Sequence, residues 1–473
     1  MQHYRRINNI LGWAVFFISG IVYTLTMEPT AGWWDVGEFI AGAYKLEVGH
    51  PPGAPVHMLL GRFFSLFAGD VSNAAYMVNL LSGVASAGTI FLLYHTIVML
   101  TGKLYLQENR STAENIVIIG SGLVGSLAFA FTDSFWFSAV EGEVYALSSF
   151  FTAAVFWAIL RWESEAGNKY ANRWLILIAY LIGISIGVHL LSLLVLPAIG
   201  LVYYFKKYTF SWKGFLITLA VSMAILGSIQ VVLIPGIPRV AFGFDLFFVN
   251  TLGMPFNSGM LVFMVLLFGL FFWAIYNTRK KKLVAWNTLA LMFLVILIGY
   301  TSYGVIIIRA TANPPMNQNQ PDNAYSLLGY VNREQYGQHP LLYGPYYNTP
   351  ALAASGIKKY YSKVDGRYEV TGSTAEKTIY ESSMMTFFPR MHSSDPLHAE
   401  VYKNWGAVSG KPVKVNTGEE EVTLIKPTFI ENLRFFVSYQ MGYMYFRYFM
   451  WNFAGRQNDK PGHGDFSSGN WVS

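Results

Sequence analysis

The 473-residue sequence contains no cysteine and unusually little charge. Without cysteine, the chain has no disulfide framework, no thiolate metal site and no cysteine nucleophile. Charged residues make up 13% of the chain and hydrophobic residues 53%, whereas an ordinary soluble protein carries about 25% charged residues. A soluble chain of this length would form several domains, whose wetted surfaces require more charge. The composition therefore excludes a soluble cytosolic enzyme, a disordered regulator and a secreted disulfide scaffold.

The few charges are unevenly distributed along the chain. Residues 1–308 hold 17 Lys and Arg and 13 Asp and Glu, while residues 309–473 hold 16 and 14 in about half the length. The net charge of +6 does not indicate nucleic-acid binding, because the basic residues do not gather on one soluble face. We therefore expect a membrane domain at 1–308 and a more polar region at 309–473.

Long apolar runs dominate the first region. A run of roughly 17–25 apolar residues can span a bilayer as a helix, and nine runs qualify. We expect the run 174–205 to break near Gly187 and His189 into two short helices. The first run lacks a small-residue cleavage site, so we expect it to remain as a helix. The predicted spans are 10–27, 74–100, 116–136, 143–160, 174–188, 189–205, 214–235, 257–277 and 284–308.

Basic residues predict the orientation of these spans. With a cytoplasmic N-terminus, the inner segments contain 14 Lys and Arg, and the outer segments up to residue 308 contain 3. Basic residues are enriched in cytoplasmic loops, so we expect residues 309–430 to be non-cytoplasmic. Nine of the 13 acids fall on the outer side. Acids contribute little to orientation, so their excess on the outer side has another cause. It reflects either solvated loop faces or a site at the outer membrane surface.

The first outer loop contains the best local candidate for a site. Asp35 and Glu38 share one face of a short helix, and His50 precedes a rigid Pro-Pro-Gly turn. His57 and Arg62 follow in a stretch too short to span. The pattern favours a site at the lipid interface. The structural alternative is an interfacial hairpin whose acids cap helices.

A second acidic pair, Glu141 and Glu143, begins the fourth predicted span. Two such carboxylates can bind a hard divalent cation or pair with basic groups, although helix N-termini also favour acids. Further candidates are His189 at an outer hairpin, Arg239 in a predicted loop PGIPRVAFGFD, and Arg309 at the outer end of the ninth span. Arginine suits phosphate recognition. Taken alone, however, each of these residues could equally be an ordinary charge at the membrane interface, and His189 could be a histidine of the core.

Several motifs together resemble a known family. The stretches WWDVGEF, GHPPGAPVHMLLGR, EGEVYAL, GVHLLSL, IRATANPPMNQNQPDNAYSLLGYVNREQYG and RYFMWNFAGRQND are similar to those of a bacterial family of multispanning proteins. That family was long catalogued as a domain of unknown function and is grouped with protein O-mannosyltransferase-like enzymes of the GT-C superfamily. The resemblance covers essentially the whole chain.

This resemblance implies an all-α polytopic fold, a GT-C-like bundle of about nine transmembrane helices with interfacial outer-loop helices. It also implies an inverting glycosyltransferase of the bacterial inner membrane with a periplasmic site. The donor would be a polyprenyl-phosphate-linked, mannose-like sugar, and the acceptor a protein hydroxyl or an envelope glycan. Asp35 would be the catalytic base with Glu38 as its neighbour, although the motif here is Asp-Val-Gly-Glu instead of adjacent Asp-Glu.

The remaining candidates fit the same chemistry. Glu141 and Glu143 occupy the place of a second GT-C acidic pair, where a divalent cation is an open expectation. Transfer also requires a counter-charge for the leaving phosphate, which Arg62, Arg239 or Arg309 could supply. His50 and His189 complete the expected substrate-binding set. The composition also admits a lipid or glycan transporter (a flippase), and a non-catalytic component of an envelope assembly.

The region after residue 308 predicts a small mixed α+β structure. We expect helices at 322–335 and 396–405, and short strands at 366–371 and 378–382. The stretch 431–453 is aromatic and amphipathic and contains two arginines, which favours an interfacial helix or a sugar-stacking surface over a span. Members of the family usually continue with more spans, so we expect this sequence to be a fragment or a short member.

The predicted orientation can be tested with a single cysteine, since the chain has none of its own. We expect Ser382→Cys to react with a membrane-impermeant thiol reagent in intact spheroplasts, because the Lys and Arg asymmetry places this region outside. The parent chain controls for background labelling. Labelling only after lysis would overturn the orientation.

Overall fold

The computed structural model describes residues 2–105, 110–337, 339–416 and 420–454. The chain divides into two compact units between Arg333 and Glu334. The sequence-based boundary at 308/309 marks the end of the last predicted span. Residues 310–333 belong to the first unit because they pack against the loop that follows the first helix, for example through the bond from the Tyr330 hydroxyl to the Gly49 carbonyl.

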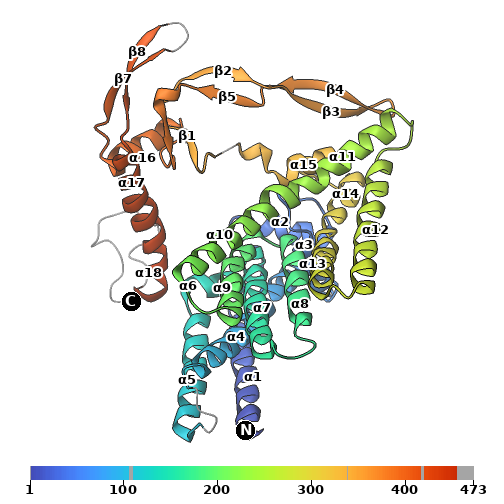
Figure 1. The fold of residues 1–473 in the computed structure, drawn as a ribbon, viewed down its shortest axis with the longest axis vertical. Helices are drawn as coiled ribbons and strands as arrows, with labels where there is room; N and C mark the ends of the chain where they lie inside the picture. Colours follow the sequence, from blue (N-terminus) through green and yellow to red (C-terminus); the bar gives the residue numbers. More distant parts are fainter. Residues whose placement is uncertain (1, 106–109, 338, 417–419, 455–473) are drawn as a thin grey trace. The chain divides into compact units, whose positions relative to one another are not determined.

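Within the described residues, eight helical segments are long and apolar enough to cross a bilayer. A ninth helix, α8 (Asn172–Ile186), is apolar but has 15 residues. The prediction of a helical polytopic membrane protein is thereby confirmed (Figure 1). The segments are built from α1 (Gln2–Leu25), α4 (Ala74–Gly102), α5 (Thr112–Ala130), α7 (Val144–Glu165), α9 (Leu196–Lys207), α10 (Trp212–Ser228), α11 (Ile234–Asn250), α12 (Ser258–Lys280), α13 (Val284–Tyr300) and α14 (Tyr303–Thr311).

The predicted break near Gly187 is confirmed. Helix α8 ends at Ile186, and the chain resumes as a 3₁₀ turn, η2 (Leu190–Val195), which leads into α9. A Cβ atom on Gly187 would lie 2.5 Å from the Ser302 hydroxyl. The Gly187 carbonyl accepts a hydrogen bond of 2.8 Å from the Val56 amide. The break therefore also fixes the start of α3 (Pro55–Ser65), a short helix of the first outer loop.

The predicted loop around Arg239 is wrong. Arg239 lies within α11, which continues from α10 through a π-helical turn, η3 (Ile229–Leu233). Pro235 lies in the first turn of α11, where a missing N–H has little cost. Pro238 has no N–H to bond the carbonyl of Ile234 four residues earlier, and that carbonyl accepts instead from the Tyr300 hydroxyl at 2.7 Å. The segment Trp212–Asn250 has 39 residues, about 58 Å at helical rise and longer than a ~30 Å hydrocarbon core.

Short helices precede or follow several of the spans. Helices α2 (Val36–Lys45) and α3 follow α1, and α15 (Ala324–Val331) follows α14. The predicted span 116–136 ends earlier than expected, because α5 stops at Ala130 and a separate helix, α6 (Asp133–Ala139), follows. Helices α2 and α3 fit the short helices expected in the loop after the first span, whereas α6 was not predicted; these elements carry most of the candidate site.

Helices α8 and α13 approach each other at two glycines. A Cβ on Gly183 would lie 2.7 Å from the Cα of Ile296, and a Cβ on Gly299 would overlap the backbone of Gly183. Small residues allow such close helix contacts in membranes, where packing replaces the hydrophobic effect as the driving force. The short α8 is thereby held in the bundle by backbone contact.

Among its described residues, the second unit contains four two-stranded antiparallel ribbons, two longer helical segments and two short 3₁₀ turns. The predicted strands and the helix at 396–405 are confirmed by β4, β5 and α16 (Pro396–Gly406). A longer segment starts with α17 (Phe429–Phe435) and continues through η6 (Phe436–Phe446) into α18 (Arg447–Ala454). The ribbons pair β1 (Tyr343–Pro345) with β6 (Met385–Phe387), β2 (Ala351–Ser355) with β5 (Lys377–Tyr380), β3 (Lys358–Val364) with β4 (Arg367–Thr374), and β7 (Lys411–Asn416) with β8 (Glu421–Lys426).

Glu431 ties the start of α17 to the preceding turn. Its buried carboxylate accepts hydrogen bonds from the amides of Ser409, Gly410 and Thr428 and from the Ser409 hydroxyl. Burial favours the neutral acid, but these bonds outweigh it and lower the pKa of Glu431 to about 2. The carboxylate therefore stabilises the turn at any ordinary pH.

The glycine contact between α8 and α13 predicts a position-specific loss of stability. Gly183→Ala should lower the melting temperature in detergent, by an amount equivalent to ~1–3 kcal/mol, because the added methyl meets the backbone of Ile296. Gly269→Ala in α12 is the matched control, since a Cβ there meets nothing within 4 Å. Equal melting temperatures for the two variants would contradict the packing.

Candidate functional site

The first outer loop is fastened to the segment that carries the second acidic pair. The amide of Glu28 donates to the carbonyl of Val140 at 3.0 Å. The buried Asn79 side chain donates to the carbonyls of Glu28 and Thr30 at 2.7 and 3.0 Å. A Cβ on Gly32 would lie 2.9 Å from Oε2 of Glu141, so glycine allows the carboxyl group to approach the loop backbone. The two predicted motifs are therefore brought together.

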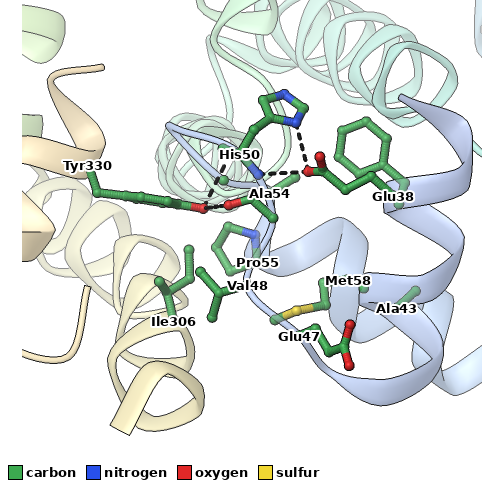
Figure 2. A pocket seen from close by; sticks show the side chains of 14 residues that line it. Glu38, Ala43, Glu47, Val48, His50, Ala54, Pro55, Met58, Ile306 and Tyr330 are labelled. Atoms are coloured by element: carbon green, nitrogen blue, oxygen red, sulfur yellow. Dashed lines mark hydrogen bonds and ion pairs between the residues drawn. The ribbon is translucent and has the colours of Figure 1, made fainter. Parts of the chain in front are cut away.

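Glu38 is the most extensively bonded acid of the loop. Its Oε1 accepts from the amide and from Nδ1 of His50 at 2.6 and 2.8 Å, and its Oε2 accepts from Gln318 at 3.1 Å. Figure 2 shows the His50 ring directed at the carboxylate. Burial raises the pKa of Glu38, but the His50 bonds outweigh it and leave the pKa below its usual value. The bond to Glu38 in turn raises the pKa of His50.

Glu141 and Glu143 are buried and hold their protons more tightly than ordinary carboxyls. Burial, with the charges of Glu143 and Glu28, raises the pKa of Glu141 to about 7. Burial also raises the pKa of Glu143, although its Oε2 accepts from the Val144 amide at 3.1 Å as the N-cap of α7. Glu143 therefore fits both interpretations of this motif: it belongs to the buried acidic group, and it also caps the N-terminus of α7.

Asp35 differs from the other acids in its exposure. It is solvent-exposed immediately before α2 and makes no side-chain capping bond there. Its charge raises the pKa of both His50 and Glu143, which places it in the same electrostatic group. The preceding Trp34 has a φ of 61°, an uncommon conformation for a bulky residue. Asp35 is thus the accessible carboxylate of a group whose other acids are largely buried.

The segment after α14 covers the first loop. Backbone bonds join Val48 to Met316 and Gln318 at 3.0 and 3.1 Å, and the buried Tyr330 hydroxyl donates to the Gly49 carbonyl at 2.7 Å. Together with Glu38, His50 and the side chain of Ile306, Tyr330 lines a small pocket (Figure 2). The Asn- and Pro-rich motif that was predicted to follow the last span therefore completes the site.

Two of the three candidate arginines bind the end of α2. Arg62 donates to the Tyr44 carbonyl at 2.6 Å, and Arg309 donates to the carbonyls of Leu46 and Lys45 at 2.6 and 3.3 Å. Free carbonyls at a helix C-terminus attract cations. Arg239 is exposed on α11. None of the three has a hydrogen bond to the acids among the described residues.

His189 lies beside residues that the sequence argument did not select. Its ring is 5.3 Å from the ring of Tyr145, and its Nδ1 accepts from the Leu191 amide at 3.2 Å. Burial, assisted by the charge of Arg333, lowers the pKa of His189. Tyr145 and Arg333 stand in the motifs EGEVYAL and YVNREQYG. In the sequence, the only sign of a role for Tyr145 and Arg333 was that they belong to these motifs. Their relation to His189 arises from the fold.

His57 is a second residue whose environment the sequence did not reveal. It is completely buried in α3, its ring lies 5.3 Å from the ring of Phe39, and burial lowers its pKa to about 4. No hydrogen-bond partner among the described residues reaches either ring nitrogen. We interpret it as a neutral residue of the core that supports α2, the helix of Glu38.

The acidic pair does not by itself form a metal centre. Among the described residues, no group of three or more His, Asp or Glu side chains has the arrangement of a metal site.

Comparisons with known proteins match two parts of the chain. Residues 35–212 match the model of the protein O-mannosyl-transferase TMEM260 N-terminal domain, and residues 337–437 match a family of unknown function, DUF8416. The chain resembles protein O-mannosyltransferases. It is 29% identical over 174 residues to mouse protein O-mannosyl-transferase TMEM260, and 26% identical over 140 residues to the Dictyostelium discoideum protein of the same name.

These alignments cover 37% and 29% of this chain, and 22% and 15% of the mouse and Dictyostelium proteins. The match thus spans about a fifth of the length of these relatives. No solved structure matches the chain. The predicted resemblance to O-mannosyltransferases is confirmed for this part of the chain. The matched region 35–212 includes seven of the nine candidate residues, namely Asp35, Glu38, His50, Arg62, Glu141, Glu143 and His189.

The raised pKa of Glu141 predicts a pH-dependent gain in stability on substitution. Between about pH 4.5 and pH 7, the unfolded carboxyl ionises before the folded one, so stability falls as the pH rises. Glu141→Gln should therefore raise the melting temperature at pH 8, by a few degrees or ~1–3 kcal/mol, and change it little at pH 4. The exposed Glu400→Gln serves as the control. A pH-independent effect would contradict the raised pKa.

Proposed function

We propose that the chain is a membrane glycosyltransferase of the GT-C type. It transfers a mannose-like sugar from a polyprenyl-phosphate donor to a protein hydroxyl, or to an envelope glycan, on the non-cytoplasmic side of a bacterial inner membrane. The observation that carries the proposal is the accessible Asp35 carboxylate beside buried Glu141 and Glu143, in a region similar to O-mannosyltransferases. Orientation with the N-terminus in the cytoplasm would place this cluster at the outer surface.

In the proposed reaction, the acceptor hydroxyl oxygen attacks the anomeric carbon of the sugar. The new C–O bond forms as the bond to the donor phosphate oxygen breaks, and the lipid phosphate leaves with the bonding electrons. A single displacement inverts the configuration at the anomeric carbon. The hydroxyl proton passes to a carboxylate, which acts as general base.

Asp35 fits the role of that base better than Glu38. The Glu38 carboxylate already accepts from His50 and Gln318, and its pKa is lowered, so it is a weak proton acceptor. Asp35 is exposed and makes no capping bond. We assign proton transfer to Asp35 and the positioning of the loop to Glu38. The sequence left the division of roles between Asp35 and Glu38 open, because the two acids are not adjacent as in the motif of the family.

The acidic pair supports the substrate in a different way. With a pKa of about 7, Glu141 is substantially protonated near neutral pH and can donate a hydrogen bond to a sugar hydroxyl. A neutral carboxyl also repels the donor phosphate less than a carboxylate would. Burial also raises the pKa of Glu143, in the same direction as that of Glu141. The pair therefore suits a sugar-binding role beside an anionic donor.

The counter-charge for the phosphate would come from His50 and Arg333. The pKa of His50 is raised by Glu38, which favours the cation, and the charge of Arg333 acts on His189 at the same site. Arg62 and Arg309 instead hold the end of α2. In this proposal they position the loop, and they affect donor use through its geometry.

A lipid or glycan transporter is the second candidate, since the membrane helices also fit that function. Transporters bind their substrates near the bilayer midplane at interrupted helices. Here the carboxyl cluster lies in and beside short helices that follow or precede the spans. This placement favours chemistry at the membrane surface.

The proposal predicts the effect of removing the base. Asp35→Asn retains the shape of the side chain but removes the proton acceptor, so sugar transfer by the purified protein should fall roughly 10²–10⁴-fold. The melting temperature should change little, because Asp35 is exposed. The measurement is transfer of sugar from a polyprenyl-phosphate donor to an acceptor peptide.

Glu38→Gln is the matched comparison in the same helix. It should reduce transfer less than Asp35→Asn does and should lower thermal stability, because it weakens the bonds from His50. The opposite ranking would exchange the two roles. Transfer at the parent rate by Asp35→Asn would refute the mechanism, and flux of lipid-linked sugar without transfer in any form would favour the transporter.

A further inference from the structure

The helical segment from Phe429 to Ala454 is organised by a row of side chains four residues apart. Phe435 stacks on Tyr439 and Tyr439 on Tyr443, with ring centroids 5.1 and 5.7 Å apart. The Arg447 guanidinium lies 3.8 Å from the centroid of Tyr443 and 5.3 Å from that of Trp451. This row, Phe435 to Trp451, continues along η6 and α18.

The row attaches the segment to the rest of the second unit. Trp405 of α16 lies 5.3 Å from Tyr439 and 5.0 Å from Tyr443, and Tyr402 lies 4.9 Å from Phe435. Phe435 is buried as a result. One face of the segment is therefore already used for packing within the unit.

A second row remains on the surface. Tyr445 stacks on Phe449 at 6.4 Å and Phe449 contacts Phe453 at 5.3 Å, yet these side chains are 57%, 47% and 67% exposed. Met450 and Phe446 beside them are also exposed. We call this surface the outer aromatic face. A contiguous apolar surface of this kind marks an interaction site.

The composition of the segment suits the lipid–water interface. From Asn432 to Ala454 there is no acid, whereas Arg434 and Arg447 are both present. Aromatic residues are enriched where bilayers meet water, and a basic amphipathic helix is attracted to anionic lipid headgroups. The segment is not among the described helices apolar enough to span.

We propose that the outer aromatic face binds the surface of the bilayer that the first unit spans, with the helix lying in the headgroup region. Covalent attachment to a membrane-embedded unit keeps the helix close to lipid, so that binding is effectively intramolecular. Apolar burial of Tyr445, Phe449 and Phe453 supplies the driving force, and the two arginines add attraction to anionic lipid headgroups. The inference is independent of the proposed glycosyl transfer.

The experiment uses the full chain, whose lack of cysteine allows single labels. Phe449→Cys carries an environment-sensitive fluorophore in vesicles of phosphatidylcholine and phosphatidylglycerol. We expect a blue-shifted emission that lipid nitroxides at a shallow acyl position quench more strongly than deep nitroxides do. Met450→Cys, on the same face, provides an independent second label in case one substitution disturbs the helix.

Two reference positions calibrate depth. Val265→Cys on α12 is 72% exposed within a span and should be quenched most by deep nitroxides, whereas Val370→Cys on β4 is 51% exposed and should be quenched by neither. If both labels on the outer aromatic face behave like Val265, the segment spans the bilayer and the proposal is wrong. If both behave like Val370, the face contacts water or protein, which equally overturns it.

Discussion

Four acidic side chains lie close together in a partly desolvated site of the first unit. The structure around them depends on how their charges are stabilised. Asp35, Glu38, Glu141 and Glu143 act on one another or on His50. Such a group is stable only if hydrogen bonds and protons offset the repulsion. Glu38 is stabilised by His50 and Gln318, whereas Glu141 is relieved by holding its proton near neutral pH. Asp35 remains accessible to solvent, which leaves it available for proton transfer.

The backbone around these acids is fixed by distant parts of the first unit. Asn79 of α4 holds the start of the loop, Gly187 holds the start of α3, and Tyr330 holds the turn at Gly49 and His50. A loop at a membrane surface needs such partners, because its polar groups are poorly satisfied near lipid. The position of the candidate base therefore depends on α4, on the break after α8 and on the segment after α14.

The sequence predicted the membrane architecture well because its signals are local. Apolar runs identified all nine helical regions, and Gly187 with His189 marked the break between α8 and η2. The loop around Arg239 was mispredicted because Pro235 and Pro238 usually end helices. Here Pro235 lies in a first turn, and the Tyr300 hydroxyl binds the carbonyl that Pro238 leaves without a backbone donor. The acids of the candidate site were also selectable from the sequence. The contacts of Tyr145, Arg333 and His57 were not, because they arise only from tertiary packing.

The arginines show why residue type alone could not assign roles at this site. Arg62 and Arg309 were chosen for phosphate recognition, yet both bind carbonyls at the end of α2, whose partial negative charge attracts cations. Two cations from opposite ends of the first unit thus converge on one helix terminus, which fixes the helix that begins beside Asp35. In the proposed function, a donor phosphate would then be bound by cations whose positions depend on the fold, such as His50, whose pKa is raised by Glu38. A substitution that loosens the end of α2 would therefore disturb the candidate base and the counter-charge together.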